Sequence, residues 1–167
     1  MSRFAVIETP IPRNQSARVE PITLIVAHAT DGGTGLSSVD WQRNGRVNGK
    51  PVQSSYHVII EDDGKRLRCV QDTRVAWHAG ASEWDGRRGV NAWSLGFAFA
   101  IRNNGREPIT PDAWASALEL CREWMGLHAG ITGTDRIVTH AMVSPGRKSD
   151  LLAAQFDLGA FRRAVRP

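Results

Sequence analysis

The strongest constraint on the fold of this chain is a nearly unbroken apolar run, ITLIVA, which covers residues 22–27 and ends at His28. A short apolar run of this kind is typical of a strand that is buried on both faces. Such a strand needs other elements packed against each side of its sheet. We therefore expect residues 22–27 to lie in the middle of a sheet that helices cover.

Further strands and helices follow along the chain. Strands are expected at residues 56–60, 66–70, 94–101 and 136–139, and helices at residues 37–44, 111–129 and 158–165. The Asp-Gly pair at residues 63–64 predicts a hairpin between the first two of these strands. Residues 1–20 are expected to be an irregular lead-in, and residues 72–92 an ordered loop. This order predicts a single α/β domain over residues 1–167, with a mixed, mostly central sheet flanked by helices.

The composition limits the partners that the chain can have. The chain has a net charge of +4 and a pI near 9.7. No apolar run approaches the roughly 18 residues that suggest a membrane span, so no stable membrane insertion is expected. The basic charge favours polyanionic partners, but the arginines form no long block and no nucleic-acid-binding motif is present. We therefore predict no nucleic-acid partner.

The cysteines and the N-terminal segment bear on the compartment. Cys69 and Cys121 have apolar neighbours and no metal-ligand spacing, which predicts two buried thiols and favours a reducing compartment. The N-terminal apolar stretch is short and is interrupted by Glu8 and two prolines, so it does not resemble a secretory signal. We expect synthesis in the cytoplasm without a signal peptide.

Three side chains far apart in the sequence can form a metal site. His28 and His140 each follow an apolar strand, and both imidazoles can point into one cleft if the two strands are neighbours. A turn at Pro145-Gly146 would bring Asp150 back to them. Two histidines and one carboxylate are a catalytic zinc set, in which zinc lowers the pKa of a water molecule to about 7. The spacing alone is not specific, because many histidines at strand ends are simply packed or solvated.

Lys148 stands two residues before Asp150, so both side chains face the same way if the segment is extended. An ammonium group cannot be a metal ligand, but it can stabilise a developing oxyanion. The pair therefore suits a site in which a metal and a cation act on one carbonyl group.

Several segments together resemble the zinc-dependent N-acetylmuramoyl-L-alanine amidases, a group related to peptidoglycan recognition proteins and to small phage amidases. The matching segments are LIVAHAT (24–30), SSYHVIIEDDGK (54–65), VAWHAG (75–80), NAWSLGFAF (91–99) and THAMVSPGRKSD (139–150). They occur in the order found in the family, and the resemblance covers residues from about 22 to 165.

The resemblance implies a role for each residue that matches a family motif. His28, His140 and Asp150 match the zinc ligands, Tyr56 and Lys148 match the catalytic tyrosine and lysine of the phage branch, and His78 matches a position that lines the substrate groove. The implied reaction is hydrolysis of the amide between the lactyl group of N-acetylmuramic acid and L-alanine. The ordinary pKa values of lysine and tyrosine both lie near 10, so which of the two handles protons stays open.

Neighbouring residues complete the expected site. Trp77 stands beside His78 and could stack on a sugar or a peptide, and Asn91 is expected to bind substrate or to fix its loop. Tyr56 and His57 are adjacent in an expected strand, so only one of them can face the cleft. We expect Tyr56 to face it, with His57 packed on the opposite face.

One departure from the family pattern shapes the expected function. Many relatives carry a glutamate at the position of Ala98, and this residue acts as a base in the cytosolic wall-recycling branch. The alanine, with the missing secretory signal and wall-anchoring domain, favours a monomeric phage or prophage endolysin that acts on peptidoglycan at the bacterial cell wall after release. One alternative is a cytosolic amidase that recycles muropeptides. The other is a peptidoglycan-binding module without activity, which the three filled ligand positions disfavour.

Overall fold

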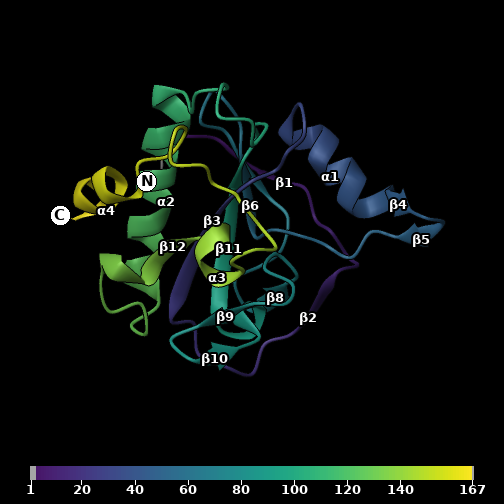
Figure 1. Cartoon of the computed structure of the whole chain (residues 1–167), viewed down its shortest axis with the longest axis horizontal. Coiled ribbons are helices and arrows are strands. Elements are labelled where there is room, and N and C mark those ends of the chain that lie inside the picture. Colours follow the sequence, from purple (N-terminus) through teal and green to yellow (C-terminus); the bar gives the residue numbers. More distant parts are fainter. Residues whose placement is uncertain (1–2, 167) are drawn as a thin grey trace.

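The computed structural model describes residues 3–166 and contains a central sheet of six strands (Figure 1). In spatial order the strands are β1 (Val6–Glu8), β7 (Arg66–Arg68), β6 (Val58–Ile60), β11 (Ser94–Phe99), β3 (Leu24–Ala29) and β12 (Ile137–Thr139). The β6–β7 pair is antiparallel, as the expected hairpin requires, and the other neighbouring pairs are parallel. The sheet is therefore mixed, with β11 and β3 at its centre.

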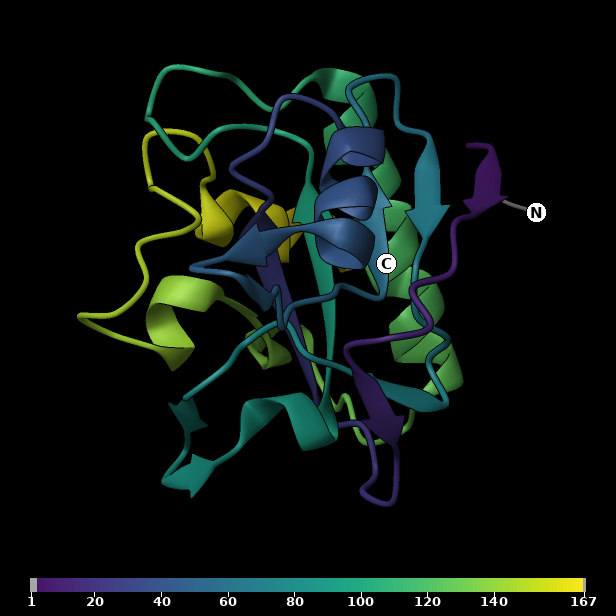
Figure 2. The same ribbon diagram turned by 90° about the vertical axis from the view of Figure 1, so that its right-hand side faces the viewer.

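Helices cover both faces of this sheet. The helices are α1 (Gly35–Asn44), α2 (Pro111–Leu127), α3 (His140–Val143) and α4 (Leu158–Val165), with 3₁₀ turns η1 (Val90–Trp93) and η2 (Thr134–Arg136). Helices α2 and α4 pack on one face, whereas α1 and α3 lie on the other (Figures 1 and 2). No helix within residues 3–166 is long and apolar enough to cross a membrane. This arrangement confirms the expected α/β class.

Strand β3 shows how the apolar run is used. All six of its residues are buried. Ile25, Ala27 and Ala29 face the core beneath α2, and Leu24 and Val26 face the opposite side. The alternation of side chains along a strand puts His28 on that opposite side, where the remaining space is polar.

The N-terminal segment differs from the expected irregular lead-in. Strand β1 pairs in parallel with β7, and β2 (Gln15–Ala17) pairs with β8 (Arg74–Ala76). Each of these N-terminal strands has three residues and mostly exposed side chains, so no hydrophobic periodicity marks them in the sequence. The expected loop at residues 72–92 likewise contains β8, η1 and the pair β9 (Glu83–Trp84) and β10 (Arg87–Arg88). One more small pair joins β4 (Arg46–Val47) to β5 (Lys50–Pro51).

Local capping explains where the helices begin. The Thr110 side chain accepts a hydrogen bond from the amide of Ala113, and α2 begins at Pro111 as predicted. Helix α1 begins at Gly35 and not at the expected residue 37, because its N-cap is Thr34. Thr34 and Ser37 form a reciprocal capping box. Helix α4 has the expected bounds.

Candidate functional site

Three elements bring His28, His140 and Asp150 together on the face of the sheet that α1 and α3 cover. His28 lies near the end of β3, and the neighbouring strand β12 leads directly into His140. His140 directly follows β12, as expected, and is the first residue of α3, whereas His28 lies within β3 and not after it. Asp150 returns to the site after a turn in which Gly146 has a φ of 75°, and its carbonyl accepts a hydrogen bond from the amide of Ala141 at 2.7 Å.

The ligating atoms of these three residues lie within 4.8 Å of one another. Nδ1 of His140 is 3.1 Å from Oδ1 of Asp150, and Nδ1 of His28 is 3.5 Å from Oδ2 of the same carboxylate. The two imidazole centroids are 4.5 Å apart. The predicted ligand set is therefore assembled, with one nitrogen of each ring directed at the carboxylate.

The donor set fits a zinc ion. Nδ1 of His28 is completely buried and has no hydrogen-bond partner among the described residues, whereas Nε2 of the same ring contacts His78 at 3.0 Å. A buried polar atom without a partner is costly, so it calls for a ligand. Two imidazole nitrogens and one carboxylate are the ligand types of catalytic zinc sites. We therefore assign His28, His140 and Asp150 as the residues that would hold zinc.

Burial and charge set the protonation of this cluster. Burial lowers the pKa of His28 to about 4, so its imidazole is neutral and able to bind a metal at neutral pH. Burial alone would raise the pKa of Asp150, but the hydrogen bond with His140 and the proximity of both imidazoles bring it well below its ordinary value. The site thus offers a neutral His28 imidazole and an ionised Asp150 carboxylate.

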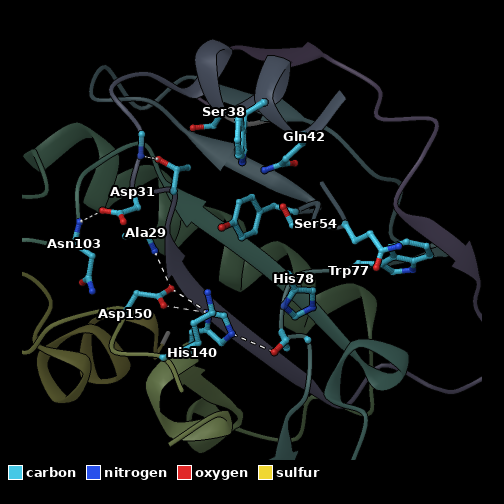
Figure 3. A pocket seen from close by; sticks show the side chains of 18 of the residues that line it. Ala29, Asp31, Ser38, Gln42, Ser54, Trp77, His78, Asn103, His140 and Asp150 are labelled. Atoms are coloured by element: carbon cyan, nitrogen blue, oxygen red, sulfur yellow. Dashed lines mark hydrogen bonds and ion pairs between the residues drawn. The ribbon is translucent and has the colours of Figure 1, made fainter. Parts of the chain in front are cut away.

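A groove of about 720 Å³ opens above the cluster. His140 and Asp150 line one side of it, Ser38 and Gln42 of α1 line the other, and Trp77 lies at one end (Figure 3). Tyr56 and Lys148 also line the groove. The Tyr56 ring is 5.2 Å from the His28 ring, and Lys148 is exposed. The groove is large enough for a small saccharide–peptide ligand.

Comparison with known proteins identifies the family. A family model described as N-acetylmuramoyl-L-alanine amidase matches residues 18–151. The chain belongs to this family. It is 35% identical to the 1,6-anhydro-N-acetylmuramyl-L-alanine amidase AmpD of Haemophilus influenzae over 99 residues, which are 59% of this chain and 52% of that protein. The match thus spans about half the length of this relative.

Two solved structures show the same amidase fold. An AmpD crystal structure superposes with a TM-score of 0.80 at 22% identity, over 98% of this chain and 95% of that chain. The endolysin N-acetylmuramoyl-L-alanine amidase LysCS of Clostridium intestinale superposes with a TM-score of 0.66 at 25% identity, over 89% and 86% of the two chains. The fold of this chain is therefore shared with an AmpD structure and with an endolysin amidase structure.

The other residues singled out in the amidase sequence take different places. Trp77 lines the groove, with its indole nitrogen 3.5 Å from Oγ of Ser16. His78 also borders the groove, but it is only 5% exposed and both of its ring nitrogens have partners. Asn91 lies behind the groove, where its side-chain oxygen accepts from two backbone amides.

Tyr56 and His57 lie on opposite sides of the backbone, although both precede β6 and neither belongs to a strand. Tyr56 faces the groove. His57 is completely buried, with Nδ1 accepting from the amide of Gly96 at 3.0 Å and Nε2 3.2 Å from the carbonyl of Arg74.

Sequence reasoning missed one wall of the groove. Helix α1 contributes Trp41, which is 49% exposed, and Gln42, whose buried Oε1 has no hydrogen-bond partner within residues 3–166. Asp31, in the loop between β3 and α1, lines the groove as well. Nothing in the local sequence marks these residues, because their role depends on where α1 packs.

Ala98, where the resemblance implies a glutamate in many relatives, lies in β11. It pairs in register with His28 of β3 and Ile59 of β6, and it is completely buried. Its neighbours Phe97 and Phe99 face the α2 core, so Ala98 faces the same side as His28. The carboxylates that line the groove are those of Asp31 and Asp150.

Proposed function

We propose that this chain is a zinc-dependent amidase that hydrolyses the bond between N-acetylmuramic acid and L-alanine. The observation that carries the proposal is the set of His28, His140 and Asp150 at the base of a groove, with a buried imidazole nitrogen that lacks a partner. Membership of the amidase family gives the class of bond.

The chain's own residues have separable tasks in this reaction. Zinc, when bound, would supply Lewis-acid polarisation of the amide carbonyl and an activated water nucleophile. Lys148 is exposed at the groove, where its ammonium group would stabilise the negative charge that develops on the carbonyl oxygen. Because the Lys148 side chain is exposed, its approach to substrate costs mainly side-chain conformational entropy.

Tyr56 would act as a hydrogen-bond donor. Burial raises the pKa of its phenol above the ordinary value, and the nearby carboxylates of Asp150 and Asp31 raise it further. The phenol therefore keeps its proton near neutral pH and can donate it to an oxygen or nitrogen of the substrate amide. This assignment makes Lys148 the residue that stabilises negative charge and Tyr56 the residue that donates a hydrogen bond to the substrate amide.

The substrate that we propose is a soluble 1,6-anhydro-muropeptide, which an enzyme of wall recycling would meet in the cytoplasm. The support is the relative from Haemophilus influenzae, whose name specifies the 1,6-anhydro sugar. The two buried free thiols, Cys69 and Cys121, suit a reducing compartment. We expect a monomer to suffice, because one chain supplies all the residues of the site. This replaces the endolysin as the leading hypothesis.

An endolysin that acts on intact wall is the second candidate. Ala98 favours it, because the resemblance places a glutamate there in the recycling branch, and the structural similarity to LysCS at 25% identity supports it too.

A substrate comparison tests both candidates. The purified protein, with zinc added, is incubated with an anhydro-muropeptide of defined stem peptide and with intact sacculi, and new N-terminal alanine is quantified by mass spectrometry. A recycling enzyme releases the stem peptide from the soluble fragment at a much higher kcat/KM. Preferential release from sacculi would reverse the order of the two candidates, and release from neither would reject the amidase proposal.

A further inference from the structure

The hydrogen bonds behind His28 fix which of its nitrogens carries the proton. Nε2 of His28 lies 3.0 Å from Nδ1 of His78, and the two rings are nearly perpendicular. Nε2 of His78 is 3.1 Å from Oγ of Ser94, and that hydroxyl donates to the carbonyl of Val90 at 2.6 Å. All three side chains are buried.

The order of protons follows from the carbonyl at the end of this chain. A carbonyl can only accept, so the single hydroxyl proton of Ser94 goes to Val90. Oγ of Ser94 must then accept from Nε2–H of His78, which leaves Nδ1 of His78 as an acceptor. His28 must therefore donate through Nε2–H. Its Nδ1 keeps the lone pair, and Nδ1 is the atom that faces Asp150.

The next residue contacts the second histidine ligand. The carbonyl of Ala79 lies 3.2 Å from Nε2 of His140 and can only accept, so it stabilises the Nε2–H form of the ring, which is the form that zinc binding at Nδ1 would require. The Asp150 carboxylate, 3.1 Å from Nδ1, also only accepts, so in the zinc-free protein the two acceptors compete for the single proton of a neutral ring. Arg147 is 3.4 Å from the same Nε2, but its guanidinium donates to the Ala79 carbonyl and to Ser144 over shorter distances. Two consecutive residues thus orient both imidazole ligands.

Asn91 holds this pair of residues in place. Its Oδ1 accepts from the amides of His78 at 3.1 Å and Ala79 at 2.7 Å. Asn91 lies in η1, the same short turn that supplies the Val90 carbonyl. The turn therefore anchors the backbone of residues 78–79 and the far end of the hydrogen-bond chain.

A glycine in the middle of a buried strand makes room for the arrangement. A Cβ atom on Gly96 would lie 2.5 Å from Cγ of His78. Glycine weakens a strand interior, so its presence in β11 is explained by this close approach. The His78 ring occupies the space that a side chain at position 96 would fill.

We propose that His78 and Asn91 are positioning residues and not substrate contacts: His78 presets the tautomer of His28, and Asn91 orients His140 through the backbone of Ala79. The proposal rests on the zinc site of the proposed function and assigns these two residues a place in it. Partners that orient ligand histidines typically change metal affinity about 10–100-fold when they are removed.

The test combines metal affinity with the protonation pattern of the metal-free protein. Zinc affinity is measured by competition with a chromophoric chelator for the wild-type protein and for His78→Phe, His78→Gln and Asn91→Ala. Long-range ¹H–¹⁵N NMR spectra of the zinc-free wild-type protein report which ring nitrogen of each histidine is protonated. Circular dichroism checks that each variant is folded, and His128→Phe, at the end of α2, is the control histidine substitution.

The expected results are specific to a positioning role. His28 and His78 each carry the proton on Nε2 in the zinc-free protein. His78→Phe and Asn91→Ala weaken zinc binding about 10–100-fold, His78→Gln recovers part of the loss because its amide can accept and donate, and His128→Phe has no effect. Protonation of His28 on Nδ1, or unchanged zinc affinity in folded His78→Phe with a raised KM, would overturn the proposal.

The outcome separates this inference from the proposed function. A wild-type protein that shows the expected tautomers but binds no zinc would reject the zinc amidase and, with it, the role of these residues toward a metal. A wild-type protein that binds zinc and cleaves muropeptide, but shows the opposite tautomers, would reject only the positioning role.

Discussion

Nδ1 of His140 lies 3.1 Å from Oδ1 of Asp150, across a turn that the amide of Ala141 closes by donating to the Asp150 carbonyl. This backbone hydrogen bond holds the start of α3 beside the segment that ends at Asp150. The Asp150 carboxylate therefore reaches the imidazoles directly from this turn. The three side chains thus lie together without an ion, and the entropy lost in ordering them is part of the free energy of folding and not of metal binding.

Replacing Asp150 by asparagine tests this set directly. The amide keeps the shape of the side chain but removes the negative charge, so we expect zinc affinity to fall at least about 100-fold, the upper end of what loss of a ligand's orienting partner costs. Hydrolysis should be lost in parallel. Metal content after dialysis and the rate of stem-peptide release measure the two effects. An Asp150→Asn protein that kept stoichiometric zinc would contradict the assignment.

Lys148→Ala should separate catalysis from metal binding. The side chain is exposed and forms no part of the ligand set, so zinc content should not change. Loss of an oxyanion partner typically lowers kcat on the order of 100-fold. Lys65→Ala, on the β6–β7 hairpin, is a control for the loss of one positive charge. Loss of zinc from Lys148→Ala would show that the role assigned to this residue is wrong.

Tyr56→Phe isolates the phenol hydroxyl, because the ring that packs 5.2 Å from His28 is retained. We expect unchanged zinc affinity and unfolding free energy, with kcat reduced about 10²-fold or more if the hydroxyl takes part in proton transfer. Steady-state kinetics on the defined muropeptide provide the measurement. A variant with wild-type kcat would remove Tyr56 from the reaction.

The fold, and the convergence of His28, His140 and Asp150, could be predicted from sequence for the same reason. The apolar run before His28 and the Pro-Gly turn before Asp150 are local signals. The run predicts a buried strand that leads to His28, and the turn predicts a chain reversal that returns Asp150 to the same edge of the sheet. The wall of the groove was not predictable. Trp41 and Gln42 lie on a helix with only a weak apolar face, so the direction in which they point depends on how α1 packs on the sheet.

The role of His78 was also beyond local reasoning. The AWHAG segment suggested a groove residue, and His78 does border the groove. Its partners, however, come from β3 and from the start of β11, which are distant in sequence. Hydrogen bonds between such segments depend on tertiary packing, for which a single sequence has no periodic signal.

Trp77 and Trp41 should contribute to substrate binding and not to chemistry. Both line the groove without belonging to the cluster of His28, His140 and Asp150, and an indole ring offers a flat apolar surface to a sugar or peptide. We expect Trp77→Ala and Trp41→Ala to raise KM several-fold, within the roughly 0.5–1.5 kcal/mol that an aromatic contact contributes, with kcat nearly unchanged. Trp84→Ala, on the β9–β10 pair outside the groove, is the matched control. A fall in kcat at constant KM would place either ring in the reaction instead.

The buried His57 should make the protein sensitive to acid. Burial, with the positive charge of Arg18, lowers the pKa of His57 to about 3, whereas an unfolded chain has a histidine pKa near 6.5. The unfolded state therefore binds more protons between these values. The stability due to neutral His57 is fully present above about pH 6.5 and is lost as the pH falls toward 3, at about 1.4 kcal/mol per pH unit for one proton.

In His57→Gln, whose amide can still accept from Gly96 and donate to Arg74, this dependence should disappear. Urea unfolding of the zinc-free proteins between pH 7.5 and 4.5 measures it, because the other histidines contribute equally to both. The wild-type unfolding free energy should fall more steeply than that of the variant, and parallel curves would show that His57 is not the residue responsible.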